Sequence, residues 1–263
     1  MVSVSVDVNL FLLPLFFIAG AIVGSVFTAV IYRVPNQLAV IKKYACRHCN
    51  SSIKGAGLIP ILSYVLLGGK CRSCKKKISV HYVIIEMLTA LSFMFLYAFY
   101  GFGFELLLYL ALWSMLIITF FIDLEHMVVS DAVLFTFLPF VAVYLLFTNA
   151  PWLYHVLGLV VGFAVFLAIY IAAKRFYGKE AFGFGDVMLS GAVGAFLGWD
   201  RAILVLILSF IIAFVVIVFL RIVGKQLKRE MEIPFGPFVC VAAAIASLYG
   251  NEIIQLYWGI NVV

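Results

Sequence analysis

Residues Glu105 to Asp123 read ELLLYLALWSMLIITFFID, an apolar run with one acidic residue at each end. A helix that crosses a bilayer needs about 20 mainly apolar residues, so this stretch predicts a transmembrane helix from about 105 to 122. Of the 263 residues in the chain, 66% are hydrophobic and only 11% are charged. A soluble domain carries about 25% charged residues. The sequence therefore predicts an all-α polytopic membrane protein.

Similar apolar runs lie on both sides of this stretch, separated by charged and turn residues. Together they predict about eight transmembrane helices, at 10–32, 81–100, 105–122, 131–148, 153–173, 186–199, 202–222 and 235–249. The first residues lack the basic segment of a cleavable signal peptide, so we expect the first run to remain as a helix. No repeat or low-complexity linker separates the helices.

The basic residues are concentrated in one segment. Ten of the eighteen Lys and Arg lie between Arg33 and Lys77, where there is no Asp or Glu. Beside membrane helices this pattern indicates a cytoplasmic loop rather than a nucleic-acid-binding segment. With eight helices, both termini are then expected outside. The predicted domains are a first helix at 1–32, a cytoplasmic loop at 33–80 and a seven-helix membrane domain at 81–263.

Four cysteines in this loop form two C-x-x-C pairs. Cys46 and Cys49 are separated from Cys71 and Cys74 by 21 residues, which is close to the spacing of a four-thiolate zinc site. A shell of four thiolates leaves no open position, so we expect the zinc to be structural. Disulfides are the alternative, but they require an oxidising compartment.

Two carboxylates stand at the ends of apolar runs. Asp123 ends the run quoted above, and Asp186 follows Gly183-Phe184-Gly185 at the start of another. If the two helices pack together, the carboxyl groups face each other at the inner membrane interface, where one can activate water while the other donates a proton. That arrangement describes an aspartic protease. The alternative is that each Asp caps a helix or lies in headgroup water.

Three further residues are candidates for supporting roles. Gly183 and Gly185 leave the backbone bare beside the carboxylate, so that another chain can approach closely. Glu86 lies about one turn inside a predicted span, where a carboxylate is costly without a partner. It is expected either to be exposed at the interface or to pair with a Lys or Arg of the loop.

Five segments in the same order resemble the type 4 prepilin peptidase family, the bifunctional leader peptidases and N-methyltransferases of pilus assembly and type II secretion. The resemblance covers nearly the whole chain. The first segment is the end of the first span, from Gly24-Ser25 to Pro35. The second contains the paired C-x-x-C motifs, with Ile59 to Tyr64 between them and Ile78-Ser79 and Glu86 after them. The other three are Ile122-Asp123, Gly183 to Asp186, and Pro234 to Phe238.

The resemblance implies cleavage of the leader of a prepilin or pseudopilin on the cytoplasmic side, with Asp123 and Asp186 as the catalytic pair. It also implies a location in the cytoplasmic (inner) membrane of a prokaryote, contact with membrane lipids, and no nucleic acid. Bifunctional members then methylate the new N-terminus from S-adenosylmethionine. They often carry a Glu between positions corresponding to Asn36 and Tyr44, and this chain has no acid there. Methyl transfer is therefore left open.

Two other functions fit a polytopic membrane protein. A transporter or channel uses carboxylates at mid-membrane depth, whereas the acids here lie near the ends of the predicted helices. A non-catalytic scaffold for pilus assembly, held together by zinc, is the other alternative.

Overall fold

The computed structural model describes residues 9–40, 46, 49, 51, 60–147, 151–177, 183–223 and 234–258. In these residues the regular elements are helices, with one isolated β-bridge between Lys70 and Lys77. The helices are a short 3-10 helix η1 (Leu10–Leu12), α1 (Leu13–Arg33), α2 (Leu62–Leu66), α3 (His81–Tyr100), α4 (Phe104–His126), α5 (Asp131–Phe147), α6 (Trp152–Tyr177), α7 (Phe184–Leu197), α8 (Trp199–Ile222) and α9 (Gly236–Trp258). The predicted all-α class is confirmed.

Six of the described helices are long and apolar enough to cross a membrane, so the chain is a multi-pass membrane protein. They are α1 with η1, α3, α4, α6, α8 and α9. The other two apolar helices are shorter, with 17 residues in α5 and 14 in α7. At 1.5 Å per residue, α7 is only about 21 Å long, less than the hydrocarbon core of about 30 Å. The predicted count of eight spans thus remains a prediction.

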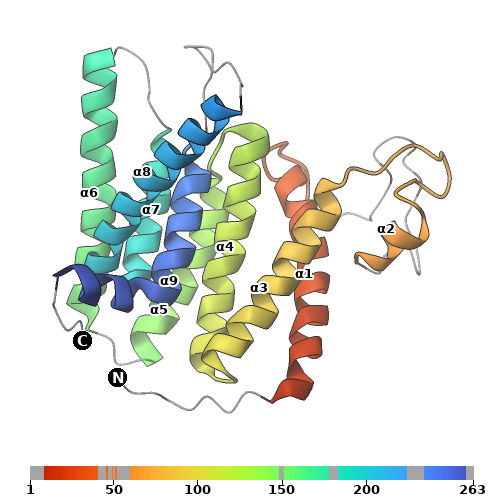
Figure 1. Cartoon of the computed structure of the whole chain (residues 1–263), viewed down its shortest axis with the longest axis horizontal. Helices are drawn as coiled ribbons and strands as arrows, with labels where there is room; N and C mark the ends of the chain where they lie inside the picture. Colours follow the sequence, from red (N-terminus) through yellow and green to blue (C-terminus); the bar gives the residue numbers. More distant parts are fainter. Residues whose placement is uncertain are drawn as a thin grey trace. The chain divides into compact units, whose positions relative to one another are not determined.

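The chain forms two compact units, residues 1–117 and 118–263, and the boundary between them falls within α4. In the first unit α1 packs on α3 (Figure 1). Two glycines of α1 make this contact close. A Cβ atom on Gly20 would lie 2.8 Å from the Ala90 Cα, and one on Gly24 would lie 2.8 Å from the Glu86 Cα. Such close packing of small residues is typical of membrane helix pairs.

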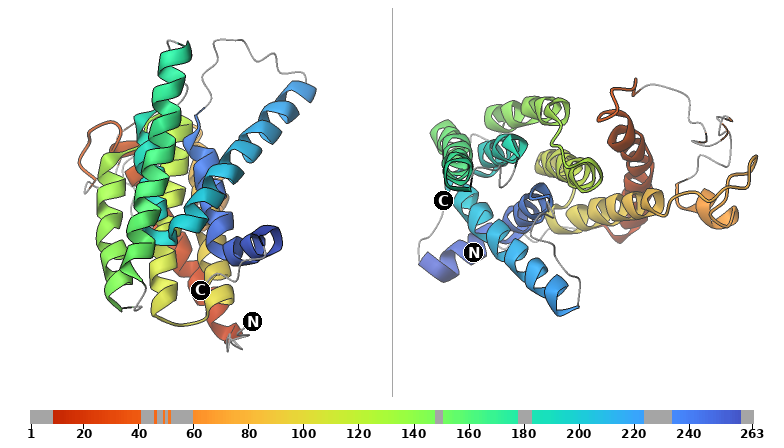
Figure 2. Two further views of the ribbon diagram at one scale, coloured as in Figure 1. Left: turned by 90° about the vertical axis from the view of Figure 1, so that its left-hand side faces the viewer. Right: turned by 90° about the horizontal axis from the view of Figure 1, so that it is seen from above.

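In the second unit α7 is the central helix. It contacts α5, α6, α8 and α9, and 11 of its 14 residues are buried. Viewed from above, α7 lies end-on among these neighbours (Figure 2). A short helix that is apolar on all sides is stable here because protein, rather than lipid, surrounds it.

The contact between α6 and α7 brings the two backbones together. A Cβ on Gly158 would lie 2.1 Å from the Gly194 carbonyl oxygen, and one on Gly162 would lie 2.4 Å from the Ser190 carbonyl oxygen. The Ser190 hydroxyl also donates to the Gly162 carbonyl at 2.9 Å. These contacts fix the position of α7, which carries Asp186 in its first turn.

Candidate active site and metal centre

Asp123 and Asp186 lie close together in the second unit. Asp123 is in the last turn of α4 and Asp186 is in the first turn of α7, and each is only 4% exposed. Both face Gly236, the first residue of α9. The position of a Cβ on Gly236 would be 2.6 Å from Asp123 Oδ2 and 3.1 Å from Asp186 Oδ1. The two oxygens are therefore no farther apart than the sum of those distances.

Backbone N–H groups orient both carboxylates. Gly183 is the N-cap of α7, and its N–H donates to the Asp186 carboxylate while its carbonyl accepts from the Asp186 N–H at 3.1 Å. The bond from the N-cap N–H to the side chain of the third helical residue is one half of a capping box; the other half is absent because glycine has no side chain. The Gly236 N–H donates to the Asp123 carboxylate. Asp186 thus lies at the start of its own helix, where the helix dipole favours negative charge, whereas Asp123 lies at the end of α4 and meets the start of another helix, α9.

One oxygen of each carboxylate has no hydrogen-bond partner among the described residues. These buried atoms are Asp123 Oδ2 and Asp186 Oδ1, the same two that face Gly236. Buried carboxylate oxygens are nearly always hydrogen-bonded. The pair therefore has capacity to bind a water molecule or a shared proton between the two side chains.

The two glycines before Asp186 have different surroundings. A Cβ on Gly185 would lie 2.6 Å from the Val129 Cβ, so this glycine is needed for contact with the α4–α5 connection of the same chain. Gly183 is exposed, and the nearest atom to its Cβ position is the Gly185 nitrogen at 3.8 Å. Of the two, Gly183 is the one that the described residues leave open to another chain.

Gly236 is a site residue that the spacing of acids and cysteines did not identify. It lies in Pro234-Phe235-Gly236-Pro237-Phe238, which the sequence marks only as the opening of the last span. A glycine between prolines at a helix start signals a close approach of other atoms. That signal does not reveal which atoms approach, because the partner carboxylates are far away in the sequence.

The four cysteines of the loop form a cluster in the first unit that can hold a metal ion. Their sulfur atoms all lie within 4.8 Å of one another, with 3.8 Å between the sulfurs of Cys46 and Cys74 and 4.0 Å between those of Cys49 and Cys71. Tetrahedral sulfur ligands at about 2.3 Å from zinc are about 3.8 Å from each other. The cysteines are free thiols, so the disulfide alternative does not describe this structure.

The two C-x-x-C turns are closed in the same way. The Cys46 N–H donates to the Ser51 carbonyl and the Cys71 N–H donates to the Lys76 carbonyl, both at 2.9 Å. Despite a hydrogen bond from the Lys76 N–H, burial and the neighbouring thiols raise the pKa of the Cys74 thiol to about 11, whereas hydrogen bonds from the backbone N–H groups of Cys74 and Ser73 lower the pKa of the Cys71 thiol to about 6. A lowered pKa favours the thiolate form that binds metal ions.

Glu86 connects α3 to the loop. Its Oε2 accepts a hydrogen bond of 2.7 Å from the Ile61 N–H. The partner found among the described residues is thus a backbone group, and the loop residues Lys42, Lys43, Arg47 and Lys54 lie outside them. Ile61 has φ 61° and ψ −54°, and the Leu62 N–H donates to the Pro60 carbonyl at 2.5 Å. This is a γ-turn of the rare, strained kind. Glu86 holds it in place.

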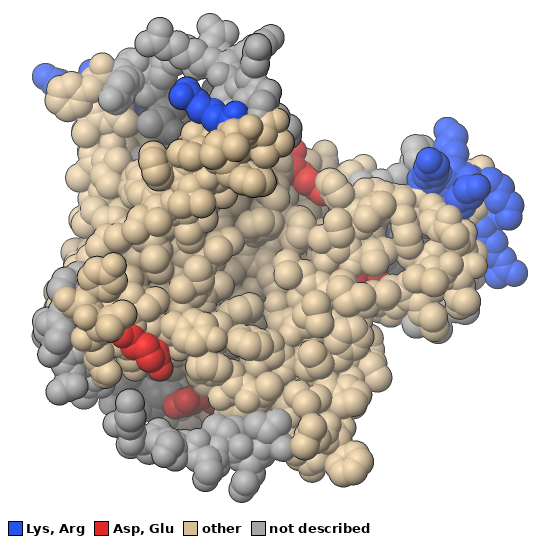
Figure 3. Space-filling view, viewed as in Figure 1, with Lys and Arg blue, Asp and Glu red and all other residues tan. Residues whose placement is uncertain are grey.

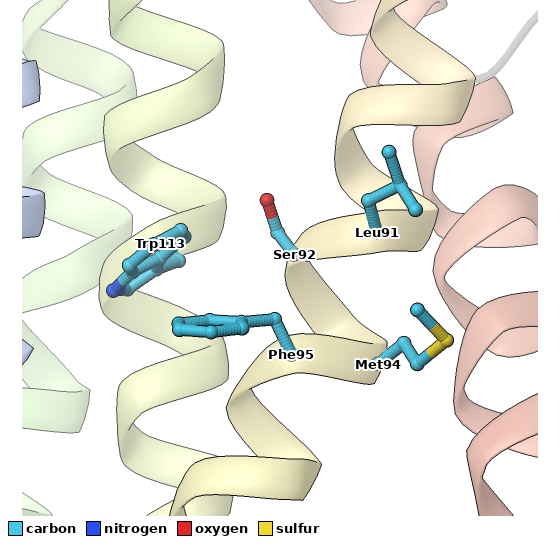
Figure 4. A pocket seen from close by; sticks show the side chains of 5 residues that line it. All are labelled: Leu91, Ser92, Met94, Phe95 and Trp113. Carbon is cyan, nitrogen blue, oxygen red and sulfur yellow. The ribbon is translucent and has the colours of Figure 1, made fainter.

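A hollow of about 330 Å³ lies elsewhere in the first unit. It is lined by Leu91, Ser92, Met94 and Phe95 of α3 and Trp113 of α4 (Figure 4). None of these side chains is acidic, basic or a metal ligand, and none is a predicted site residue. The hollow therefore offers no acid–base chemistry.

The chain matches known peptidases over most of its length. Residues 18–100 match the Bacterial Peptidase A24 N-terminal domain, and residues 109–218 match the Type IV leader peptidase family. Asp123 and Asp186 both lie in the second matched segment. No solved structure matches the chain.

Three curated relatives share the name prepilin leader peptidase/N-methyltransferase. The Aeromonas hydrophila protein is 31% identical over 272 residues, covering 92% of both chains. The Bacillus subtilis (strain 168) protein is 33% identical, covering 94% of this chain and 98% of the relative. The Pseudomonas aeruginosa protein is 29% identical over 90% of both. These matches favour an enzyme over a transporter or a silent scaffold, and the chain therefore belongs to the type IV prepilin leader peptidase family.

Proposed function

We propose that the chain is an aspartic endopeptidase that cleaves the leader of type IV prepilins or pseudopilins at the cytoplasmic face of the membrane, with Asp123 and Asp186 as its catalytic pair. The observation that supports this proposal is that one buried oxygen of each carboxylate lies against the Cβ position of Gly236 and has no hydrogen-bond partner among the described residues. Two carboxyl groups at such a distance do not both ionise easily, so one proton is shared between them.

The proposed reaction follows from this shared proton. The charged carboxylate takes a proton from a water molecule, and the resulting hydroxide attacks the carbonyl carbon of the scissile peptide bond. The protonated carboxyl donates its proton to the carbonyl oxygen. The proton taken from water then passes to the amide nitrogen as the C–N bond breaks. The carboxylate that gave its proton to the carbonyl oxygen takes one back from a hydroxyl group of the intermediate, which leaves the new carboxyl terminus and restores the starting pair. The Gly183 and Gly236 N–H groups stabilise the charged forms during these transfers.

We also propose the membrane arrangement that this reaction requires. Eight helices cross the membrane, the loop 33–80 lies in the cytoplasm, and both termini lie outside. The N-terminal residues 1–8 and much of the loop, including positions 41–44 of the segment associated with methyl transfer, lie outside the described residues. The concentration of basic residues at 33–77 supports this orientation. Zinc bound by the four cysteines would hold the loop together.

Cleavage by purified variants tests the catalytic pair. Asp123→Asn and Asp186→Asn should each reduce the rate of prepilin cleavage at least about 1000-fold, because each removes one member of a proton-transfer pair. Asp200→Asn is the matched control. Asp200 is also 4% exposed, but its carboxylate accepts from the Tyr154 hydroxyl and the Arg201 N–H, so its rate should stay within a few fold of wild type.

The readout also separates the two activities of the family. The purified protein is incubated with a prepilin and S-adenosylmethionine, and the mass of the product is measured by mass spectrometry. A shortened product shows cleavage, and the added mass of one methyl group shows methyl transfer. If both Asn variants cleave at the wild-type rate, the aspartic mechanism is wrong.

A further inference from the structure

The loop between α1 and α3 carries an exposed surface that combines apolar and basic side chains. On α2 the side chains of Leu62, Val65 and Leu66 are 48%, 66% and 69% exposed. The C-x-x-C turn that follows carries five exposed basic residues, Lys70, Arg72, Lys75, Lys76 and Lys77. Figure 3 shows this blue patch gathered over the loop. We call the two sets together the α2–lysine surface.

The hydrogen bond from Ile61 to Glu86 places α2 at a defined depth. Glu86 is the sixth residue of α3, which begins at His81, so it lies about 7 to 8 Å along the helix axis from that start. Ile61 is the N-cap of α2. The bond therefore holds the start of α2 beside the first two turns of a membrane-spanning helix, and Figure 1 shows α2 to the side of α3.

The basic residues lie close in sequence to the start of α3, the same end of the span beside which α2 is held. Lys77 is four residues before His81, the first residue of α3. Lys70 and Lys77 also form an antiparallel bridge, which sets two positive side chains directly opposite each other. Like charges in such a pair are destabilising. The segment 33–77 contains no acid that could neutralise them, so an anionic surface outside the chain is the complementary partner.

We propose that the α2–lysine surface docks on anionic phospholipid headgroups of the membrane that the chain spans. Leu62, Val65 and Leu66 insert at the boundary between headgroups and acyl chains. The five basic residues bind the phosphate groups above them. Apolar insertion together with attraction to anionic lipid is the usual mode of interfacial helices. The Glu86 hydrogen bond sets the depth of insertion, and the metal-binding turn presents the lysines.

Hydrogen exchange of the full-length protein in lipid nanodiscs tests this proposal. The amides of Val65, Leu67 and Gly68 are hydrogen-bonded within the α2 turn, and their exchange reports how often the turn opens. In nanodiscs of phosphatidylcholine mixed equally with phosphatidylglycerol, their exchange should be at least tenfold slower than in phosphatidylcholine alone. One molar salt should remove the difference, because it shortens the screening length to about 3 Å.

Variants identify the residues that carry the effect. Lys75→Gln/Lys76→Gln/Lys77→Gln should strongly reduce the difference in exchange between the two lipids, because each lysine near an anionic surface contributes about 1 kcal/mol, or about fivefold in binding. The control Lys174→Gln/Arg175→Gln removes two exposed charges at the end of α6 and should keep the difference.

A second variant tests apolar insertion. Val65→Ser/Leu66→Ser should speed exchange of the turn in both lipids. Unchanged protection of α1 and α3 shows in each case that the variant is folded. Equal exchange of the wild type in both lipids, or a full difference in the triple Gln variant, would overturn the proposal.

Discussion

Replacing Gly236 with Ala tests the geometry of the candidate site most directly. The added Cβ would lie 2.6 Å from Asp123 Oδ2 and 3.1 Å from Asp186 Oδ1, whereas ordinary contacts begin at 3.4 Å. Asp123 must therefore withdraw by most of an ångström, and Asp186 must move slightly as well. Displacement of a reacting group by about 1 Å costs up to about 100-fold in rate.

We expect Gly236→Ala to lower kcat for prepilin cleavage about 10- to 100-fold, equivalent to about 1.4 to 2.7 kcal/mol of transition-state stabilisation. KM should stay within about twofold, since the methyl group affects the reacting carboxylates rather than the binding of the substrate helix. The assay is a time course of cleavage at several prepilin concentrations, with purified protein in detergent.

The same substitution farther along α9 is the control. The three atoms nearest to a Cβ on Gly250 belong to the side chain of Arg201, 3.0 to 3.2 Å away, and a long side chain can move aside. Gly250→Ala should keep kcat within about twofold. Melting temperatures of both variants in detergent separate loss of chemistry from loss of fold. A stable Gly236→Ala protein with wild-type kcat would refute the inference that this glycine sets the distance between the carboxylates.

Three further substitutions test the supporting structure. Gly185→Ala places a Cβ 2.6 Å from the Val129 Cβ and should destabilise the protein by about 1 to 3 kcal/mol. Adding Val129→Gly to the same chain should restore stability and cleavage. If it does not, the contact with Val129 is not the cause of the defect. Gly162→Val places a Cβ atom 2.4 Å from the Ser190 carbonyl oxygen of α7, so the variant should be aggregated in gel filtration or inactive in the cleavage assay. A monodisperse, active variant would contradict the close α6–α7 contact. Cys71→Ser should lower zinc content from about one equivalent to near zero by metal analysis, while Cys240→Ala, on α9 of the second unit and outside the two C-x-x-C pairs, should retain it; unchanged zinc in Cys71→Ser would remove the four-thiolate site.

The sequence was sufficient for the features that depend on local composition. Apolar runs between charges located the long helices, because the bilayer requires both length and apolarity. Their ends agree within about four residues except in α9, which was predicted to end near 249 and continues to Trp258. The spacing of the C-x-x-C pairs predicted a cysteine cluster, since two such turns are sufficient to bring four thiolates together. The positions of Asp123 and Asp186 at helix ends were also readable.

Contacts between distant segments were not readable from the sequence. Nothing local to Glu86 indicates that its partner is the N–H of a strained γ-turn 25 residues earlier. Nothing local to Gly236 indicates that two carboxylates face it. The roles of Gly183 and Gly185 also differ only because Val129 packs on one of them. Each of these outcomes is decided by tertiary packing, which overrides local preference.

The enclosure of α7 has a consequence for biosynthesis. A helix of 14 residues with an acidic residue in its first turn is a poor substrate for insertion by a translocon on its own, since insertion favours long apolar segments. It is expected to leave the translocon together with α6 and to be completed only when α9 has been synthesised. A chain truncated before residue 234 should therefore be recognised by membrane quality-control proteases, even though the four clustered cysteines and both acids of the proposed catalytic pair are present in it.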